Sequence, residues 1–372
     1  MSSNALDYIT VRGFKSIASI EKLALRSVNV LIGSNGSGKS NFISVFSFLH
    51  SIREGRLRDY VVQAGGAEKV LHFGSKTTKN IDVFLSFRGE VNQYELVLSP
   101  TQDDGLYPSS ETTYFWNKSS YNRPWDQSLV SREQGREAGI SDPNLAKTPS
   151  WVRARLGGWR LYHLHDTSVS SPMRKTAKVD DNQFLRPDGS NLAPFLYFLQ
   201  TKHPTSFSLI QRTIQRVAPF FDSFRLEPSR LKPDDIKLEW RHKNSDQYFD
   251  SSSFSDGTLR FIALTALFLQ PKDFLPSVIL VDEPELGLHP YAIEMLASLI
   301  RQASQNTQVI VSTQSSLLLD HFDPQDVLVA NRVDGGTKIE RLQPEPLKDW
   351  LEDYSLGQLW EKNEFAGRPS ME

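Results

Sequence analysis

The sequence predicts an α/β protein: a mixed sheet with a parallel centre, and an inserted α+β lobe. Two observations lead to this fold class. Near the N-terminus an apolar strand runs into a glycine-rich loop and then into an amphipathic helix. After residue 255, apolar strands and helices alternate, which is typical of a parallel sheet covered on both faces. The middle of the chain has no sustained heptad pattern, so we expect no long coiled-coil arm.

Composition limits the class of protein. The 372 residues, 39% of them hydrophobic, can form one large domain or two intimately joined domains. A formal net charge of -2 argues against a generally basic nucleic-acid coat but allows a local basic groove. The absence of cysteine excludes disulfides, thiolate metal sites and cysteine nucleophiles, and it fits a reducing cytoplasm.

The chain shows no targeting or membrane signal. The N-terminus lacks a basic region followed by an apolar core, and no stretch approaches the length of a membrane span. We therefore expect a cytoplasmic protein without a membrane partner.

The N-terminal part, residues 1–99, is predicted to form the first half of the fold. Apolar runs at 8–11 and 28–32 are expected strands, and 41–52 has the three-to-four spacing of a helix with one buried face. Residues 81–98 alternate polar and apolar around the turn at 88–90, which predicts a hairpin.

The middle and the end of the chain complete the expected architecture. Residues 100–250 form the inserted lobe and residues 251–372 the second half of the fold. In the lobe, 100–150 is polar and is predicted to be a surface insertion or loop, 190–222 helical, and 223–250 strands. The second half is predicted to contain helices at 258–269 and 291–303, strands at 278–281 and 308–311, and edge strands at 327–329 and 338–342.

The loop from Gly33 to Ser40 matches the phosphate-loop pattern G-x-x-x-x-G-K-S at every fixed position. Its glycines let backbone N–H groups turn toward phosphates, Lys39 brings a charge to the β and γ oxygens, and Ser40 offers a hydroxyl to magnesium. A plain Gly/Ser-rich turn is the alternative. The preceding strand and the following helix favour the phosphate loop, whose expected nucleotide-binding residues are Gly33, Ser34, Asn35, Gly36, Ser37, Gly38, Lys39, Ser40 and Asn41.

A run of four apolar residues, 278–281, ends in Asp282 and Glu283. This order places both carboxylates at the carboxyl end of a central strand, where open α/β sheets bind ligands. Asp282 is expected to hold magnesium, and Glu283 to orient and deprotonate the attacking water. The alternative is an acidic helix cap before Pro290, and the glycine loop favours the catalytic interpretation.

A third segment, Ser255-Asp256-Gly257, precedes an apolar helix. The free N–H groups and the dipole of a helix N-terminus make a natural anion site. Taken alone, Ser255 is simply an N-cap. Its place shortly before the acidic strand favours a role in nucleotide binding.

The order of glycine loop, SDGT, VDEPELGLHP and Ser312-Thr313-Gln314-Ser315 resembles that of ABC-type ATPases, and in detail their RecF/SMC-like branch. Within it the chain is similar to the stand-alone RecF-related ATPases of bacteria, assigned to the AAA family and akin to the ATPase domains of OLD-family nucleases. The phrases FKSI (14–17) and YSLGQLW (354–360) extend the likeness over most of the chain.

The resemblance implies an ABC-type P-loop NTPase head that binds ATP and Mg²⁺ and forms a head-to-head homodimer. Two ATP molecules would lie between subunits, with Ser255, Asp256 and Gly257 of one subunit capping the γ-phosphate held by the other. Gln314 replaces the switch histidine of the broader ABC pattern, and His289 takes the place of the usual aspartate after the acidic strand. Both departures predict slow hydrolysis, with Glu283 and Gln314 as the catalytic residues and Ser40 and Asp282 as the metal ligands.

Three further groups allow two interpretations each. Gln63 is either a magnesium-sensing glutamine or an ordinary surface residue. His163 and His165 are either a metal cluster with Asp166 or the polar face of a strand. Arg153, Arg155 and Arg160, among Trp151 and Trp159, either grip a nucleic-acid backbone or are solvated arginines, and the second interpretation is favoured.

The expected function is that of a RecF-like ATPase in DNA repair or in defence against foreign DNA, with double-stranded DNA as a candidate ligand. After Asp320 no clustered acidic nuclease site is visible, so a separately encoded effector such as a nuclease is expected. One rival is a regulatory protein whose ATP occupancy controls a partner nuclease or toxin without direct DNA binding. The second rival, the energising subunit of a membrane transporter, fits poorly with the large insertion.

Overall fold

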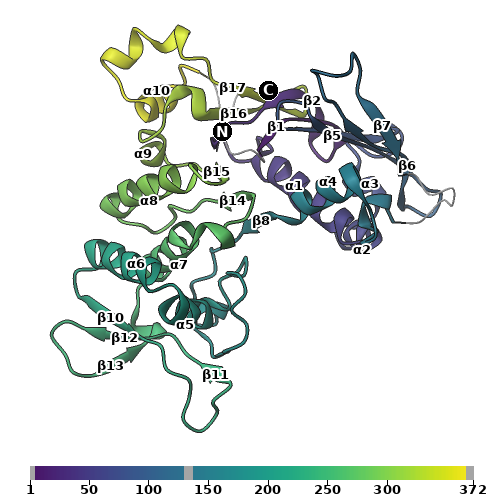
Figure 1. Ribbon diagram of the computed structural model, residues 1–372. Coiled ribbons are helices and arrows are strands. Elements are labelled where there is room, and N and C mark those ends of the chain that lie inside the picture. The colour runs from purple at the N-terminus through teal and green to yellow at the C-terminus, as the bar shows by residue number, and fades with distance from the viewer. Residues whose placement is uncertain (1–4, 130–136, 366–372) are drawn as a thin grey trace.

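The computed structural model describes residues 5–129 and 137–365 and contains two six-stranded sheets (Figure 1). The first sheet is antiparallel in the order β2-β1-β4-β5-β6-β7. Its strands are β1 (Leu6–Phe14), β2 (Ile17–Ala24), β4 (Ile81–Phe87), β5 (Asn92–Pro100), β6 (Leu106–Phe115) and β7 (Trp125–Ser128).

The second sheet is the central one and has the order β17-β16-β3-β15-β14-β8. All neighbours from β16 to β8 run parallel and β17 is antiparallel, which confirms the predicted mixed sheet. Its strands are β3 (Val28–Ile32), β8 (Trp159–Tyr162), β14 (Val278–Asp282), β15 (Gln308–Ser312), β16 (Val327–Val333) and β17 (Gly336–Arg341).

Two hydrophobic cores cover the two faces of the central sheet, because successive residues of a strand point to opposite sides. Val30 and Val281 pack in the core that contains the helices after residue 190. Leu31 and Leu280 pack in the other core, with the helix after the glycine loop and the first sheet. The predicted parallel sheet covered on both faces is therefore confirmed.

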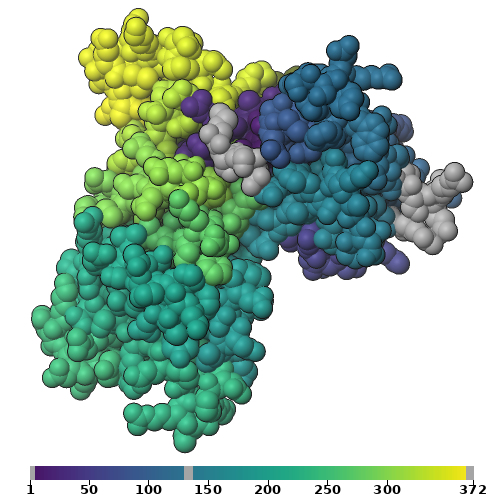
Figure 2. Space-filling view, viewed as in Figure 1, coloured from purple at the N-terminus to yellow at the C-terminus, as the bar shows by residue number. Residues whose placement is uncertain are grey.

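The helices and the small strands surround these sheets. The two small sheets are β10-β12-β13 and β11-β9. In Figure 1 the two small sheets lie in the lower part of the molecule, and Figure 2 shows the surface hollowed between them and the half that contains the first sheet. The helices are α1 (Lys39–Arg53), α2 (Leu57–Ala64), α3 (Ala67–Val70), α4 (Lys147–Gly157), α5 (Leu192–Lys202), α6 (Pro204–Val217), α7 (Asp256–Leu269), α8 (Pro290–Ala303), α9 (Ser316–Leu319) and α10 (Leu356–Lys362), and the remaining strands are β9 (Ala177–Lys178), β10 (Phe221–Arg225), β11 (Asp235–Ile236), β12 (Glu239–His242) and β13 (Tyr248–Asp250).

Two element predictions need correction. The polar stretch between the first two expected strands contains β2, whose buried residues Ile17, Ile20 and Leu23 are spaced by three. The pairing with β1 shifts register between Ile20 and Leu23. The strand therefore lacks the alternation by two that would reveal it. The stretch expected to be a surface loop, 100–150, contains β6, β7 and α4. The inward face of β6 carries Glu111 and Thr113, so the strand has no hydrophobic alternation to reveal it. Part of that stretch, 130–136, lies outside the described residues, as do 1–4 and 366–372.

The other predicted helices and strands form, with the helical stretch 190–222 divided into α5 and α6 at Pro204. Of the two strands predicted at the edge of the sheet, β17 lies at the edge, whereas β16 lies between β17 and β3. The division of the chain at residues 99 and 250 stays a prediction, and β6 and β7 extend the sheet that begins in the first part. In the described residues no helix is both long and apolar enough to cross a bilayer.

Candidate active site

Three neighbouring parallel strands, β3, β15 and β14, end at the same edge of the central sheet. The glycine loop leaves β3 at this edge, and α1 begins at Lys39. Asp282 is the last residue of β14 and is paired in register with Ser312, the last residue of β15. The topology therefore gathers the glycine loop, the acidic pair and the segment of Gln314 at one place, as open α/β sheets do with their ligands.

The glycine loop is braced by β17 and by the turn between β1 and β2. Gly38 caps α1 at φ 100°, and a Cβ there would lie 1.8 Å from Thr337 Oγ1, so only glycine fits. The Thr337 hydroxyl donates to the carbonyl of Ser37 at 3.0 Å and lies 2.7 Å from Ser16 Oγ, which in turn accepts from Asn41 Nδ2 at 2.6 Å. The sequence did not predict the role of Thr337, because it lies 300 residues from Ser37. Ser16 could have been noticed only through its place in the phrase FKSI.

Lys39 lies buried within the loop, with 6% of its surface exposed. Its Nζ donates to the carbonyl oxygens of Gly33 at 2.7 Å and Ser34 at 3.0 Å. Burial lowers the pKa of Lys39, while the nearby charges of Glu283 and Asp282 oppose that shift. The predicted cation and both predicted carboxylates therefore share one electrostatic environment.

Glu283 has an unusual backbone and a defined side-chain partner. Its φ is 40°, a left-handed conformation that costs a non-glycine residue about 1–3 kcal/mol and is typical of functional sites. The N–H of Glu283 donates to the carbonyl of Ser312 at 2.8 Å, and Gln314 Nε2 donates to the Glu283 carboxylate. The two residues predicted to be catalytic are thus in direct contact.

A third carboxylate, Glu285, lies two residues after Glu283, and no role was predicted for it from the sequence. It is 9% exposed and accepts a hydrogen bond from the Thr313 hydroxyl through Oε1. Its Oε2 is buried without a hydrogen-bond partner among the described residues, and burial raises the pKa of Glu285. Its position two residues after Glu283, in the sequence EPELG, is the feature of the sequence that could have identified it.

The SDG segment forms the exposed N-terminus of α7. Ser255 caps the helix by accepting from the Thr258 N–H at 3.2 Å, and Ser255 and Asp256 are exposed. Gly257 packs so closely on the loop after β14 that a Cβ would lie 2.2 Å from the Gly287 carbonyl oxygen. Glycine is therefore required for packing at this position.

Two buried arginines fix the N-terminal end of α7 to the segment that follows β8. Arg174 contacts the carbonyls of Thr167 (2.9 Å), Phe254 (3.1 Å) and Ser251, and its Nη2 lies 3.0 Å from Asp256 Oδ1. Arg260 of α7 donates to the carbonyls of Leu164 and His165, each at 2.9 Å. Neither arginine was predicted as a site residue, because its partners lie far away in the sequence.

The structure does not bring every predicted site residue into contact with the glycine loop. Within residues 5–129 and 137–365, no hydrogen bond or ion pair links 255–257 to the glycine loop. Gln63 is exposed on α2. His289 caps α8 by accepting from the Tyr291 N–H at 3.3 Å.

The histidine pair after β8 does not form the expected strand face. β8 ends at Tyr162, so His163 and His165 lie in the following loop with ring centroids 6.4 Å apart. Among the described residues no group of three His, Cys, Asp or Glu side chains could hold a metal ion. The proposed cluster with Asp166 is thus absent from the structure, while His163 lies close enough to Asp282 for the charges to interact.

The three arginines around α4 are bound to the protein itself. Arg155 stacks on Trp151 at 5.0 Å, and Arg160 lies over Phe184 at 5.3 Å. Arg153 donates to the Ser141 carbonyl at 3.4 Å. Arg155 and Arg160 share the lining of one cavity, and all three side chains are partly buried. The contact of these arginines with nucleic acid stays a prediction.

The polar atoms of the site fit a magnesium-bound triphosphate. The hydroxyls of Ser37, in the glycine loop, and of Ser312, at the end of β15, are buried and have no hydrogen-bond partner within the described part of the chain. Ser40 is exposed at the first turn of α1, and Asp282 is partly exposed. Unpaired hydroxyls, a buried lysine and two carboxylates are the donor set that phosphates and Mg²⁺ require.

The strand, glycine loop and helix, together with the acidic pair on a neighbouring strand, define a P-loop ATPase head of the ABC type. Residues 28–320 match the family described as "AAA domain, putative AbiEii toxin, Type IV TA system", and the chain belongs to this family. No curated protein matches the chain by sequence.

Solved structures that resemble the chain include SMC heads. A structure of the SMC head bound to the C-winged helix domain of ScpA is 17% identical, with a TM-score of 0.60 over 92% of this chain and 99% of that one. An SMC head with an extended coiled coil, bound to the C-terminal domain of ScpA and derived from Pyrococcus furiosus, is 14% identical, with a TM-score of 0.53 over 94% and 99%. The ABC-type, SMC/RecF-like fold is therefore confirmed.

Proposed function

We propose that this protein binds and slowly hydrolyses ATP, and that ATP occupancy switches it between a monomer and a head-to-head homodimer. The observation that carries the proposal is the meeting of Lys39, Asp282, Glu283 and Gln314 at the carboxyl ends of β3, β14 and β15. The family match supports the ATPase class.

Each residue has a defined chemical task. Lys39 neutralises charge on the β and γ phosphates once it leaves the carbonyls of Gly33 and Ser34. Glu283 orients water and takes its proton, and Gln314 holds the Glu283 carboxylate in place. Ser40 and Asp282 would hold Mg²⁺, which polarises the phosphate and stabilises its developing charge.

Exposed groups around the site support ATP-dependent dimerisation. Ser255 and Asp256 present the free end of α7 to solvent. Apolar side chains are also exposed on the segments that follow β14 and β15: Leu286 (51%), Tyr291 (45%) and Leu317 (38%). A second subunit would cover these groups and complete the site, and a ligand shared by two surfaces favours the closed state.

The wider role we assign to the switch is in DNA repair or defence against foreign DNA, with double-stranded DNA as a ligand and a separately encoded effector such as a nuclease. The SMC-head fold supports this assignment at the level of architecture alone. The alternative is a regulatory protein that controls a partner nuclease or toxin without binding DNA. The family description, which names a toxin and a type IV toxin–antitoxin system, favours this alternative.

The test combines two substitutions with a measurement of solution mass. Lys39→Ala should abolish nucleotide binding, because the cation in the loop is lost. Glu283→Gln should keep ATP, hydrolyse it at least about 100-fold more slowly and accumulate as a dimer. Parent-level hydrolysis by Glu283→Gln would remove the general-base role, and a mass that does not change with ATP would remove the dimer.

Binding to duplex DNA separates the two wider roles. Salt-dependent binding with and without ATP supports the DNA-directed role. If no duplex binds at low salt, the regulatory alternative remains.

A further inference from the structure

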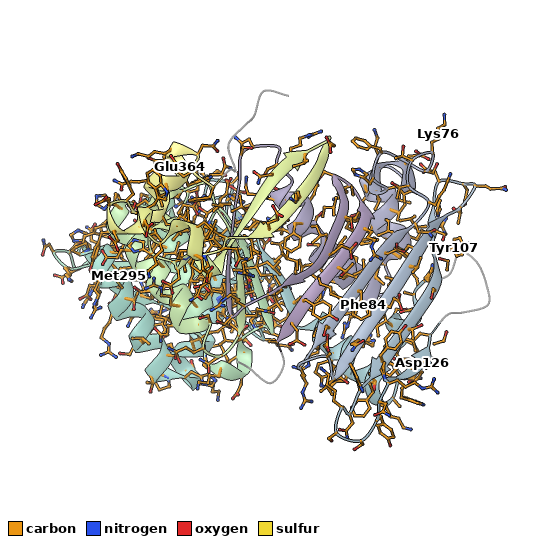
Figure 3. The ribbon with its side chains drawn as sticks, turned by 90° about the horizontal axis from the view of Figure 1, so that it is seen from above. Lys76, Phe84, Tyr107, Asp126, Met295 and Glu364 are labelled. Carbon is orange, nitrogen blue, oxygen red and sulfur yellow. The ribbon has the colours of Figure 1, made fainter. Side chains whose placement is uncertain are left out.

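A cavity of about 1150 Å³ opens beside the outer end of the first sheet. It is formed by the turn between β4 and β5, the segment joining β6 to β7 and the start of α4. None of its lining residues belongs to the active site. Figure 3 shows the edge strand of this sheet at Asp126, in the half of the molecule opposite Met295 of α8.

Aromatic side chains form the walls of this cavity. Phe115 and Trp125 face one another across β6 and β7, and they are 38% and 55% exposed. Tyr121, in the connecting segment, is 62% exposed, and its carbonyl accepts from Trp116 Nε1 at 2.9 Å. Trp151 of α4 completes the lining. Several rings on one opening provide flat apolar surfaces on which planar groups stack.

The same cavity is positively charged. Arg88, Arg123 and Lys147 line it, and none of the lining residues among 5–129 and 137–365 carries a carboxylate. Within the described part of the chain, these three cations form no ion pair. Burial lowers the pKa of the neighbouring Arg155, and the charge of Arg88 lowers it further. In a chain of net charge -2, this local excess favours an anionic occupant.

We infer that this cavity binds single-stranded nucleic acid. Unpaired bases stack on Tyr121 and Trp125, the cations contact the phosphates, and the amide of the exposed Asn122 lies in the lining to meet base edges. A duplex cannot present its bases to the cavity, because they are already stacked and paired. The inference rests on the DNA-directed part of the proposed function and adds to it a site for single strands, separate from any surface that binds duplex DNA.

The experiment measures binding of fluorescent oligothymidylate, oligouridylate and a mixed-sequence duplex of equal length by anisotropy, without nucleotide, at several salt concentrations. Trp125→Ala and Arg123→Gln are compared with Trp350→Ala and Arg216→Gln, which change an exposed tryptophan and an exposed arginine elsewhere. Trp125→Phe tests whether aromatic character is enough. ATP binding is measured on the same variants, and single-strand binding is measured on Lys39→Ala.

Trp125→Ala should weaken single-strand binding roughly 5- to 100-fold, the range for one stacked base, and Trp125→Phe should restore most of it. Arg123→Gln should weaken it and reduce its salt dependence. The control variants and Lys39→Ala should bind as the parent does, and unequal binding of the two oligomers assigns the site to DNA or RNA. Parent-like binding by Trp125→Ala, or equal weakening of duplex binding, overturns the inference. A failure of ATP binding in the parent protein overturns the proposed function and leaves this measurement unaffected.

Discussion

The side-chain amide of Gln314 donates a hydrogen bond to the carboxylate of Glu283 and so connects the ends of β15 and β14. A neutral amide can hold a carboxylate in one orientation without pairing its charge.

Gln314→Leu should therefore slow ATP hydrolysis and spare ATP binding. Loss of a hydrogen bond to a charged group corresponds to a decrease of about 10-fold in kcat, with KM little changed. Steady-state kinetics measures this split, and Gln325→Leu, an exposed glutamine beyond α9, is the matched control. A kcat equal to that of the parent would show that Glu283 needs no partner.

The sequence predicted the parts of the site that are local. Gly33 to Lys39 is a contiguous motif whose conformation follows from its glycines, and Asp282 follows directly from a buried strand. The parallel order of β3, β14 and β15 could also be expected, because alternating strands and helices favour it.

The supporting contacts could not be predicted, since they join residues that are distant in the chain. Arg174 meets Asp256 across 82 positions, and Thr337 meets Ser37 across 300. Strand β6 was missed because its buried Glu111 is satisfied by Tyr94 (2.8 Å) and by the N–H of Ile140 (2.9 Å), which removes the need for an apolar residue.

Arg174→Met should impair ATP-dependent dimerisation while ATP binding by the monomer persists. Arg174 is 7% exposed and fixes the segment before α7 through Asp256 and the carbonyls of Ser251 and Phe254. Without it, the exposed end of α7 loses its defined position, so the dimer fraction should fall several-fold. Sedimentation with ATP, in the Glu283→Gln background, measures the fraction.

The control is Arg186→Met, which removes a half-exposed arginine whose partner Asp181 lies only five residues away. Surface ion pairs of this kind contribute little. Equal dimer fractions in the two variants would mean that Arg174 has no positioning role.

Glu285 should make stability depend on pH. Burial raises the pKa of Glu285, so the folded protein holds this proton more tightly than the unfolded chain does. Its stabilising contribution is complete below the ordinary carboxyl pKa of about 4.3 and is lost as the pH rises through the raised value. Glu285→Gln keeps an acceptor for Thr313 and cannot ionise.

The decrease in melting temperature from pH 5 to pH 8 should consequently be smaller in Glu285→Gln than in the parent, by about 2 °C. Differential scanning fluorimetry at the two pH values measures it, with the exposed Glu352→Gln as control. A decrease of the same size in all three proteins would assign the pH dependence to other groups.

Thr337 supplies the last prediction, because it connects β17 to the glycine loop. Its hydroxyl donates to the Ser37 carbonyl at 3.0 Å and contacts Ser16 Oγ, which is bonded to Asn41. Thr337→Val keeps the shape beside Gly38 and removes both hydrogen bonds, so the loop is less ordered before the nucleotide arrives. Because part of the binding free energy must then be spent on ordering the loop, the affinity for ATP should fall about 5-fold, as expected for one or two neutral hydrogen bonds. Thr201→Val removes a comparable 2.9 Å bond to a carbonyl within α5 and should bind ATP as the parent does. If titration with a fluorescent ATP analogue gives Thr337→Val the parental Kd, the loop is ordered by its own glycines, and β17 contributes only to the fold.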